Sequence, residues 1–256
     1  MPPSGEVTSA LTAVSGFGDY FHVATTRPAD PVVPVLADVY AGDPVLLDHI
    51  RVVSDRLRTK ELRVGGSILF QGLAARLWSP VLAVLLLRER VLELDPATTW
   101  WSPELDAGRL HVLAPRFAAA TSDGADEVAR TVVELHLRPL AAAVRAWVSL
   151  PEALLWGNAA SALVGSLGVV ARARPDLGGM CGDLAETLVA AGPLAGAGRF
   201  TSGGARTQQG DRELPGFVRT SCCLYYRVPG GGLCGDCALT TAPATPEAPP
   251  PAPPMR

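Results

Sequence analysis

Apolar residues recur at helical spacing from Asp43 to Leu57, with polar residues between them. Asp43 stands directly before Pro44, so the aspartate can cap a helix that has proline at its first position. We therefore predict an amphipathic helix in this stretch. A shorter helix is expected near residues 8–15.

The glycine pair at 65–66 is expected to separate that helix from the next one. Ser67 is a candidate N-cap for a helix over residues 67–78, and Pro80 can open another over residues 80–90. Because proline lacks a backbone N–H, the pattern predicts two adjacent helices with a break between them.

Two stretches, residues 67–87 and 153–170, are apolar enough to raise the question of membrane insertion. The first contains Gln71 and Arg76, and an arginine at bilayer depth costs about 2.5–3.5 kcal/mol. The second has no charge but contains Asn158, serines and glycines. We therefore interpret both stretches as buried helices of a soluble core, without a transmembrane segment.

Between residues 92 and 118, prolines, threonines and tryptophans replace the helical pattern, which favours short strands. A helical face returns after residue 124 and extends to Trp147, and Pro139 should kink or split that helix. Further helices are predicted over residues 151–170 and 175–191, and residues 192–216 are expected to form a loop.

The fold class predicted from these elements is mainly α with a minor β portion (α+β): a helical body followed by a cysteine-rich carboxy-terminal segment. Seven of the last 14 residues are proline, which is typical of a disordered tail. The predicted organisation is an amino-terminal extension at 1–30, a mainly helical body at 31–216, a cysteine-rich segment at 217–241 and the proline-rich tail at 242–256.

Composition narrows the function classes. The 256 residues carry a net charge of -3, which argues against binding to nucleic acid, and 48% are hydrophobic, which excludes a mostly disordered chain. The first 25 residues lack the pattern of an export signal. We therefore expect a protein of the reducing cytoplasm.

Four of the five cysteines lie within 16 positions, at Cys222, Cys223, Cys234 and Cys237. Four thiolates are the ligand count of a tetrahedral metal site or an iron–sulfur cluster. A disulfide pair would require an oxidising compartment and a strained bond between neighbours. Zinc sites usually take ligands from two short Cys-x-x-Cys knuckles, and only the second pair is one. An iron–sulfur cluster accepts the unconventional spacing, so three interpretations stay open.

Residues around the cysteines are compatible with the cluster. Four nearby glycines, at 230–232 and 235, would let the backbone wrap closely and direct N–H groups toward sulfur. Arg219 and Arg227 would favour an added electron, although solvated surface charge is the simpler interpretation of any one arginine. Tyr225 and Tyr226 are expected to pack in a strand.

The remaining polar candidates have simpler explanations. His136 and Asn158 lie in apolar helices, where a hydrogen-bonded core role is favoured over substrate contact. Cys181 is expected to be a buried thiol. The other histidines, His22, His49 and His111, show no ligand-type pairing.

The segment from Cys222 through Arg227 to Cys237 resembles the carboxy-terminal region of FhuF-like ferric siderophore reductases. Softer similarity is carried by residues 67–70, 76–80, 136–140, 155–158 and 160–163. The resemblance implies a [2Fe-2S] cluster held by Cys222, Cys223, Cys234 and Cys237, with no catalytic residue beyond the cluster.

The resemblance further implies one-electron reduction of siderophore-bound Fe(III), of the hydroxamate type, with release of Fe(II) in the cytoplasm. No nucleotide or flavin motif is present, so we expect an external electron donor such as a ferredoxin or flavin reductase. Peripheral membrane association is compatible with this function. Two alternatives are kept: a zinc-stabilised, non-redox binding module and a protein related to siderophore biosynthesis.

Overall fold

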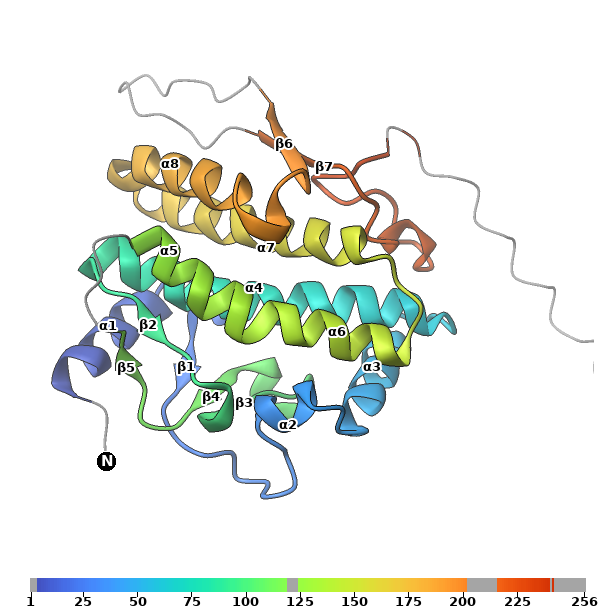
Figure 1. The fold of residues 1–256 in the computed structure, drawn as a ribbon, viewed down its shortest axis with the longest axis horizontal. Coiled ribbons are helices and arrows are strands. Elements are labelled where there is room, and N and C mark those ends of the chain that lie inside the picture. Colours follow the sequence, from blue (N-terminus) through green and yellow to red (C-terminus); the bar gives the residue numbers. More distant parts are fainter. Residues whose placement is uncertain (1–3, 119–123, 202–215, 240, 242–256) are drawn as a thin grey trace, which may run out of the picture.

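The computed structural model describes residues 4–118, 124–201, 216–239 and 241. Within them the fold is mainly helical with small sheets, which confirms the predicted α+β class. The helices are α1 (Gly5–Ser15), α2 (Leu36–Tyr40), α3 (Val45–Arg56), α4 (Leu62–Arg88), α5 (Gly124–Val128), α6 (Arg138–Trp147), α7 (Glu152–Ala173) and α8 (Gly178–Val189). Figure 1 shows α4 between α7 and α8 on one side and α1 and α3 on the other.

Helix α4 is one continuous helix of 27 residues, so the predicted break at Pro80 and the separation at the glycine pair 65–66 are both wrong. Pro80 is buried within the helix, where packing on every side holds the chain in place. The glycines allow close packing rather than a break. A Cβ at Gly66 would lie only 2.8 Å from Cγ2 of Val148, and one at Gly65 would overlap Oγ of Ser54.

Helices α4 and α7 form the centre of the core. The indole Nε1 of Trp78 donates a hydrogen bond to the carbonyl of Ala159 at 3.1 Å, and Ser79 and Ser166 share a buried hydrogen bond of 2.9 Å. Both helices are long and apolar enough to cross a membrane, but 67% of the most apolar window of each is buried inside the fold. Most residues of both windows therefore pack in the core.

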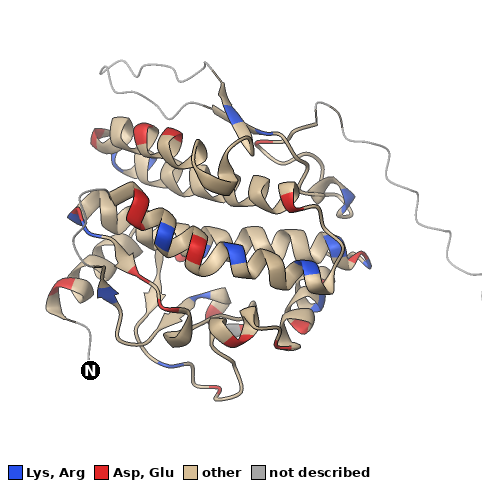
Figure 2. Cartoon of the chain, viewed as in Figure 1, with Lys and Arg blue, Asp and Glu red and all other residues tan. Residues whose placement is uncertain are grey.

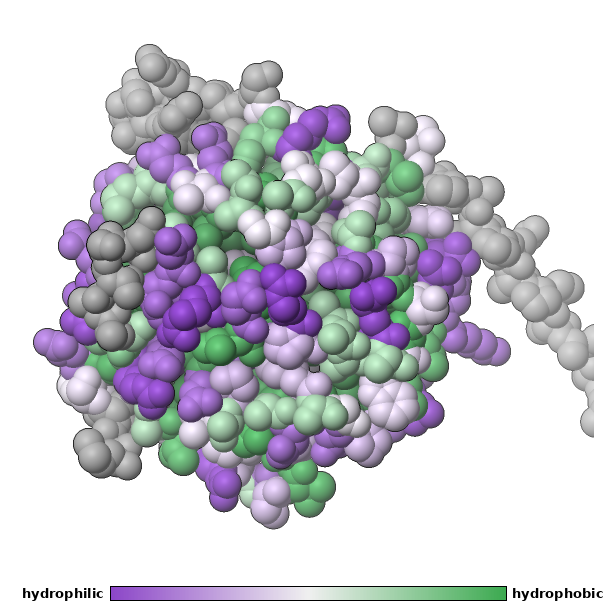
Figure 3. Space-filling model, viewed as in Figure 1, coloured by the Kyte–Doolittle hydropathy of each residue, from purple (hydrophilic) through white to green (hydrophobic). Residues whose placement is uncertain are grey.

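The helical run from Gly124 to Trp147 is continuous, and Pro139 does not break it. Residues Ala129–Leu137 form a π-helical segment, after which α6 begins at Arg138. Pro139 stands in the first turn of α6, where a missing N–H is tolerated. Charged side chains occupy the exposed face of this run, as Figures 2 and 3 show, and include the ion pair between Glu134 and Arg138.

Short strands lie between α4 and α5, as the sequence predicts. They are β2 (Leu92–Glu93), β3 (Thr99–Trp100), β4 (Leu110–Val112) and β5 (Arg116–Phe117); β4 also pairs in parallel with β1 (Val23–Ala24). A hairpin of β6 (Gly198–Thr201) and β7 (Gly216–Arg219) follows α8. Strand β6 was not predicted, because residues 192–216 read as a loop.

The residues assigned to an amino-terminal extension take part in the core. Val7, Ala10, Leu11 and Val14 of α1 are buried, and α1 packs on α4. The proline-rich stretch expected to be a disordered tail, 242–256, lies outside the described residues.

Candidate functional site

The cysteine segment, residues 219–239, lies against the outer side of α7. It begins at the last residue of β7, and its next residues donate hydrogen bonds to carbonyl groups of the body. The backbone N–H of Thr220 donates to the carbonyl of Ala197 at 3.0 Å, and Oγ of Ser221 donates to the carbonyl of Ala153 in α7 at 2.9 Å. Because Ser221 precedes Cys222, these contacts fix where the first cysteine pair begins.

Backbone N–H groups point at three of the four sulfurs. Leu224 donates to Sγ of Cys222 at 3.3 Å, Tyr225 to Sγ of Cys223 at 3.4 Å, and Leu239 to Sγ of Cys237 at 3.4 Å. Such N–H to sulfur bonds stabilise thiolate ligands. They require a tight turn, and Leu224 accordingly has a left-handed backbone (φ 69°).

The tyrosine pair after this turn differs from expectation. Tyr225–Arg227 form a 3-10 turn rather than a strand, because the N–H groups before them are directed at sulfur instead of a neighbouring strand. Gly231 then packs closely: a Cβ there would lie 2.5 Å from the carbonyl oxygen of Tyr225. The prediction that glycine allows the backbone to wrap closely is thus confirmed at this position.

All four cysteines of the segment are free, and each interacts electrostatically with at least one other of the four. Sγ of Cys223 lies 3.6 Å from Sγ of Cys234, although the two residues are 11 positions apart. Cys223 is buried, whereas Cys222, Cys234 and Cys237 are half-buried. The thiol group formed by these four cysteines is therefore partly open to solvent.

The spacing of Cys223 and Cys234 fits two thiolates bound to one tetrahedral metal ion. Two thiolates bound at about 2.3 Å to one tetrahedral metal ion lie about 3.8 Å apart, close to the separation of Cys223 and Cys234. Across the described ranges, no group of three or more His, Cys, Asp or Glu side chains converges as the ligand set of a single metal ion. The spacing of the two sulfurs fits an iron of a [2Fe-2S] cluster and a zinc ion alike.

Burial disfavours ionisation of two of the thiols, those of Cys222 and Cys234. It raises the pKa of the Cys222 thiol, and it raises the pKa of the Cys234 thiol to about 12 against the opposing effect of the Arg219 cation. Metal binding requires the thiolate, so loading the site must release protons.

Arg219 is buried, with 1% of its surface exposed, so its interpretation as solvated surface charge is wrong. Its Nη2 donates to Sγ of Cys234 at 2.8 Å, and its Nε lies 3.2 Å from the carboxylate of Asp236. Arg227 instead forms a bidentate pair with Glu61 at the start of α4, with both bonds at 2.9 Å.

Asn158 connects the body to the cysteine segment, a role that sequence reasoning missed. Its Oδ1 accepts a 2.6 Å hydrogen bond from Arg219, and its Nδ2 donates to both the carbonyl and Oγ of Ser67 at 2.9 Å. Ser67 in turn donates to the backbone carbonyl of Cys223 at 2.7 Å. The only available signal was a lone asparagine in an apolar helix.

The other candidates stay apart from the thiols. His136 is buried and hydrogen-bonded to the hydroxyl of Tyr40 and the carbonyl of Leu94, which confirms its core role. Cys181 is fully buried in α8, and burial raises its pKa to about 11. His49 packs edge-on against Trp101.

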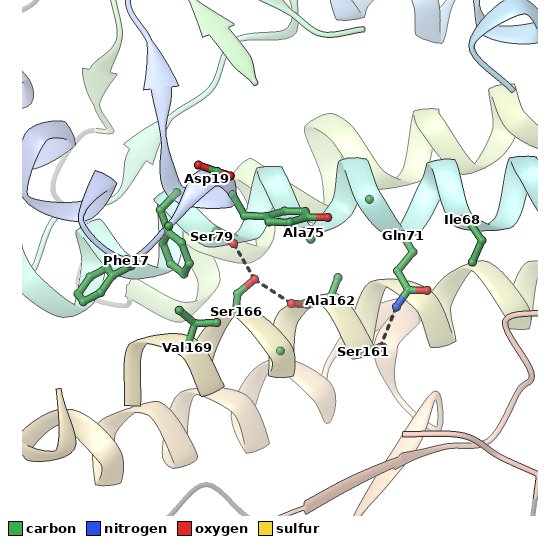
Figure 4. A pocket seen from close by; sticks show the side chains of 15 residues that line it. Phe17, Asp19, Ile68, Gln71, Ala75, Ser79, Ser161, Ala162, Ser166 and Val169 are labelled. Carbon is green, nitrogen blue, oxygen red and sulfur yellow. Dashed lines mark hydrogen bonds between the residues drawn. The ribbon is translucent and has the colours of Figure 1, made fainter. Parts of the chain in front are cut away.

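A separate hollow of about 450 Å³ opens between α4, α7 and residues 17–21 (Figure 4). Its lining is mainly apolar, and two hydrogen-bonded pairs from the facing helices lie in it: Gln71 with Ser161, and Ser79 with Ser166. No cysteine lines it, so it is distinct from the thiol group.

Residues 219–239 match the family model described as the FhuF 2Fe-2S C-terminal domain. The match spans all four clustered cysteines together with Arg219. No curated protein matches the chain. This match confirms the resemblance of the cysteine segment and the expected [2Fe-2S] cofactor. The chain therefore carries, at residues 219–239, a segment that matches the FhuF 2Fe-2S C-terminal domain.

Proposed function

We propose that this protein reduces siderophore-bound Fe(III), with Cys222, Cys223, Cys234 and Cys237 as the ligands of its [2Fe-2S] cluster. The observation that carries the proposal is the surface position of the thiol group: three of its four cysteines are half-buried. An acceptor can thus approach the site from solvent, without a channel through the core.

The chemistry is a one-electron transfer. The cluster, when bound, supplies one electron at a time. Siderophore oxygen donors hold the hard Fe(III) ion tightly and Fe(II) more weakly, so adding one electron to Fe(III) releases the metal. The protein forms no bond to the siderophore; its residues hold the thiolates and leave their outer side open.

The partners follow from this assignment. The substrate is a ferric siderophore, of the hydroxamate type, and the electron comes from an external donor such as a ferredoxin or a flavin reductase. The net charge of -3 gives no support to nucleic acid as a partner. The proposed location is the cytoplasm, where Fe(II) would be released, with peripheral membrane association as a further expectation.

The test is an anaerobic single-turnover experiment. The cluster-loaded protein is reduced with dithionite, freed of excess reductant and mixed with a ferric hydroxamate siderophore in the presence of a ferrous chelator. We expect up to one Fe(II) per cluster, formed as the visible absorbance returns to that of the oxidised protein. Unchanged absorbance with several siderophore classes would contradict the proposal.

The zinc-stabilised binding module is the alternative that the same sample addresses. A zinc protein would be colourless and would contain no acid-labile sulfide. We expect two irons and two sulfides per chain after anaerobic purification. One zinc per chain without sulfide would contradict the reductase and support the zinc-stabilised binding module. A role in siderophore biosynthesis gains no support from the described fold.

A further inference from the structure

Arg219 is the only buried arginine among the described residues, and its surroundings explain why it is there. It ends strand β7, which places its side chain between α7 and the turn that carries Cys234. Its backbone N–H also donates to the carbonyl of Asp236 at 3.1 Å. Both its main chain and its side chain are thus bound to the second cysteine pair.

A buried guanidinium is costly unless anionic partners compensate it. Asp236 gives partial compensation at 3.2 Å, and Sγ of Cys234 is the nearer contact at 2.8 Å. As a cluster ligand this sulfur would be a thiolate, and the one electron taken up on reduction would increase the negative charge facing the Arg219 cation. The interaction is therefore stronger with the reduced centre than with the oxidised one.

Asn158 determines where the guanidinium points. Its Nδ2 is held by two acceptors on Ser67, so its Oδ1 must face the opposite way, toward Nη1 of Arg219. The side chain of Asn158 is fully buried, so water cannot replace it as the acceptor. With Nη1 fixed on Asn158, the planar guanidinium directs Nη2 at Sγ of Cys234.

We propose that Arg219 raises the reduction potential of the cluster through its contact with Cys234, and that Asn158 is the positioning residue for this effect. The proposal rests on the [2Fe-2S] domain and on the four cysteines as ligands. It is independent of which acceptor receives the electron.

The test is an anaerobic redox titration of the cluster-loaded full chain, normalised to iron and sulfide content. At a fixed solution potential, Arg219→Met should lower the ratio of reduced to oxidised cluster about tenfold, which corresponds to about 59 mV. Asn158→Ala keeps the charge of Arg219 but removes the acceptor that orients its guanidinium. It should lower the ratio about threefold, which corresponds to roughly 28 mV.

Two controls separate this effect from general loosening of the fold. Arg227→Met removes a charge from the same segment, but one paired with Glu61, and Gln71→Ala removes a different hydrogen bond between α4 and α7. Both should leave the potential near that of the unchanged protein.

The outcomes are distinct. An unchanged potential in Arg219→Met would overturn the proposal, and an unchanged potential in Asn158→Ala alone would overturn the positioning role. If methionine at 219 prevents cluster binding, Arg219→Gln, which is neutral but still polar, gives the same comparison. A loaded protein that fails to reduce siderophores while showing these shifts would refute the proposed function but not this inference.

Discussion

Oγ of Ser67 donates a 2.7 Å hydrogen bond to the backbone carbonyl of Cys223, joining the central helix to the first cysteine pair across 156 positions of sequence. Ser67→Ala leaves this buried carbonyl without its partner, at a cost of about 1–3 kcal/mol in the free energy of unfolding. We expect the Ser67→Ala variant to lose its visible absorbance faster than the unchanged protein in mild urea. Helical content, followed by circular dichroism during urea unfolding, gives the reference for this rate.

The matched control is Ser79→Ala. Ser79 is also buried in α4 and hydrogen-bonded to α7, through Ser166, but it does not touch the cysteine segment. Ser79→Ala should lower the free energy of unfolding. At equal helical content, it should leave the rate of absorbance loss unchanged. Equal rates in the two variants would show that Ser67 acts only on the body.

Replacing Cys222 or Cys234 by serine should abolish the visible absorbance and leave most of the helical circular dichroism. The reason is that the helical core is built from α4 and α7 and does not include these thiols. Cys181→Ala is the control: it removes a fully buried thiol of α8 and should keep the colour. Retained colour in either serine variant would reject that cysteine as a ligand.

Gly157 provides the close approach between α7 and the cysteine segment. A Cβ there would lie 2.2 Å from Oγ of Ser221, the residue before Cys222. Gly157→Ala should therefore break the bond from Ser221 to Ala153 and reduce the iron content after purification, at a cost of about 1–3 kcal/mol in stability.

The control lies on the same helix. A Cβ at Gly165 meets nothing within 4 Å, so Gly165→Ala should stabilise α7 by roughly 0.5–1 kcal/mol and keep full iron content. Equal iron content in both alanine variants would mean that the segment tolerates displacement from α7.

His136 makes stability depend on pH. Burial lowers its pKa from 6.5 to about 4, while the hydrogen bond to the carbonyl of Leu94 acts in the opposite direction. Between these two values the unfolded chain binds a proton that the folded chain does not. The free energy of unfolding should therefore fall as the pH drops from about 6.5 to 4, by up to about 3 kcal/mol.

This prediction is checked by urea unfolding at several pH values in the Cys222→Ser background, so that acid loss of the cluster does not contribute. His136→Gln, which cannot titrate, should show a shallower dependence over the same range. An equal slope in both proteins would assign the pH dependence to other groups.

The helical pattern predicted most of the elements, because apolar spacing is a local property of the sequence. Asp43 caps α3 as expected, with its Oδ1 accepting from the N–H of Val45 at 2.9 Å. The predicted break at Pro80 was wrong because the packing around this buried residue outweighs the tendency of proline to interrupt a helix. Strand β6 was missed because its pairing with β7 depends on residues distant in sequence.

The site was predictable where it depended on spacing and not where it depended on burial. The four cysteines identified the cofactor-binding segment from sequence alone. Nothing adjacent to Arg219 distinguishes it from the exposed arginines, since its burial arises from β7 and from Asn158, 61 positions away. Asn158 was likewise assigned to the core, where it does lie, without its link to the thiols.

The docking of residues 219–239 on α7 has a consequence for biogenesis. The ribosome builds the chain from its amino terminus, so α4 and α7 are complete before Cys222 is translated. The last thiols to emerge therefore meet a helical platform that already presents Ser67 and Asn158. This order favours delivery of iron and sulfide to a body that has already folded, rather than to a nascent chain.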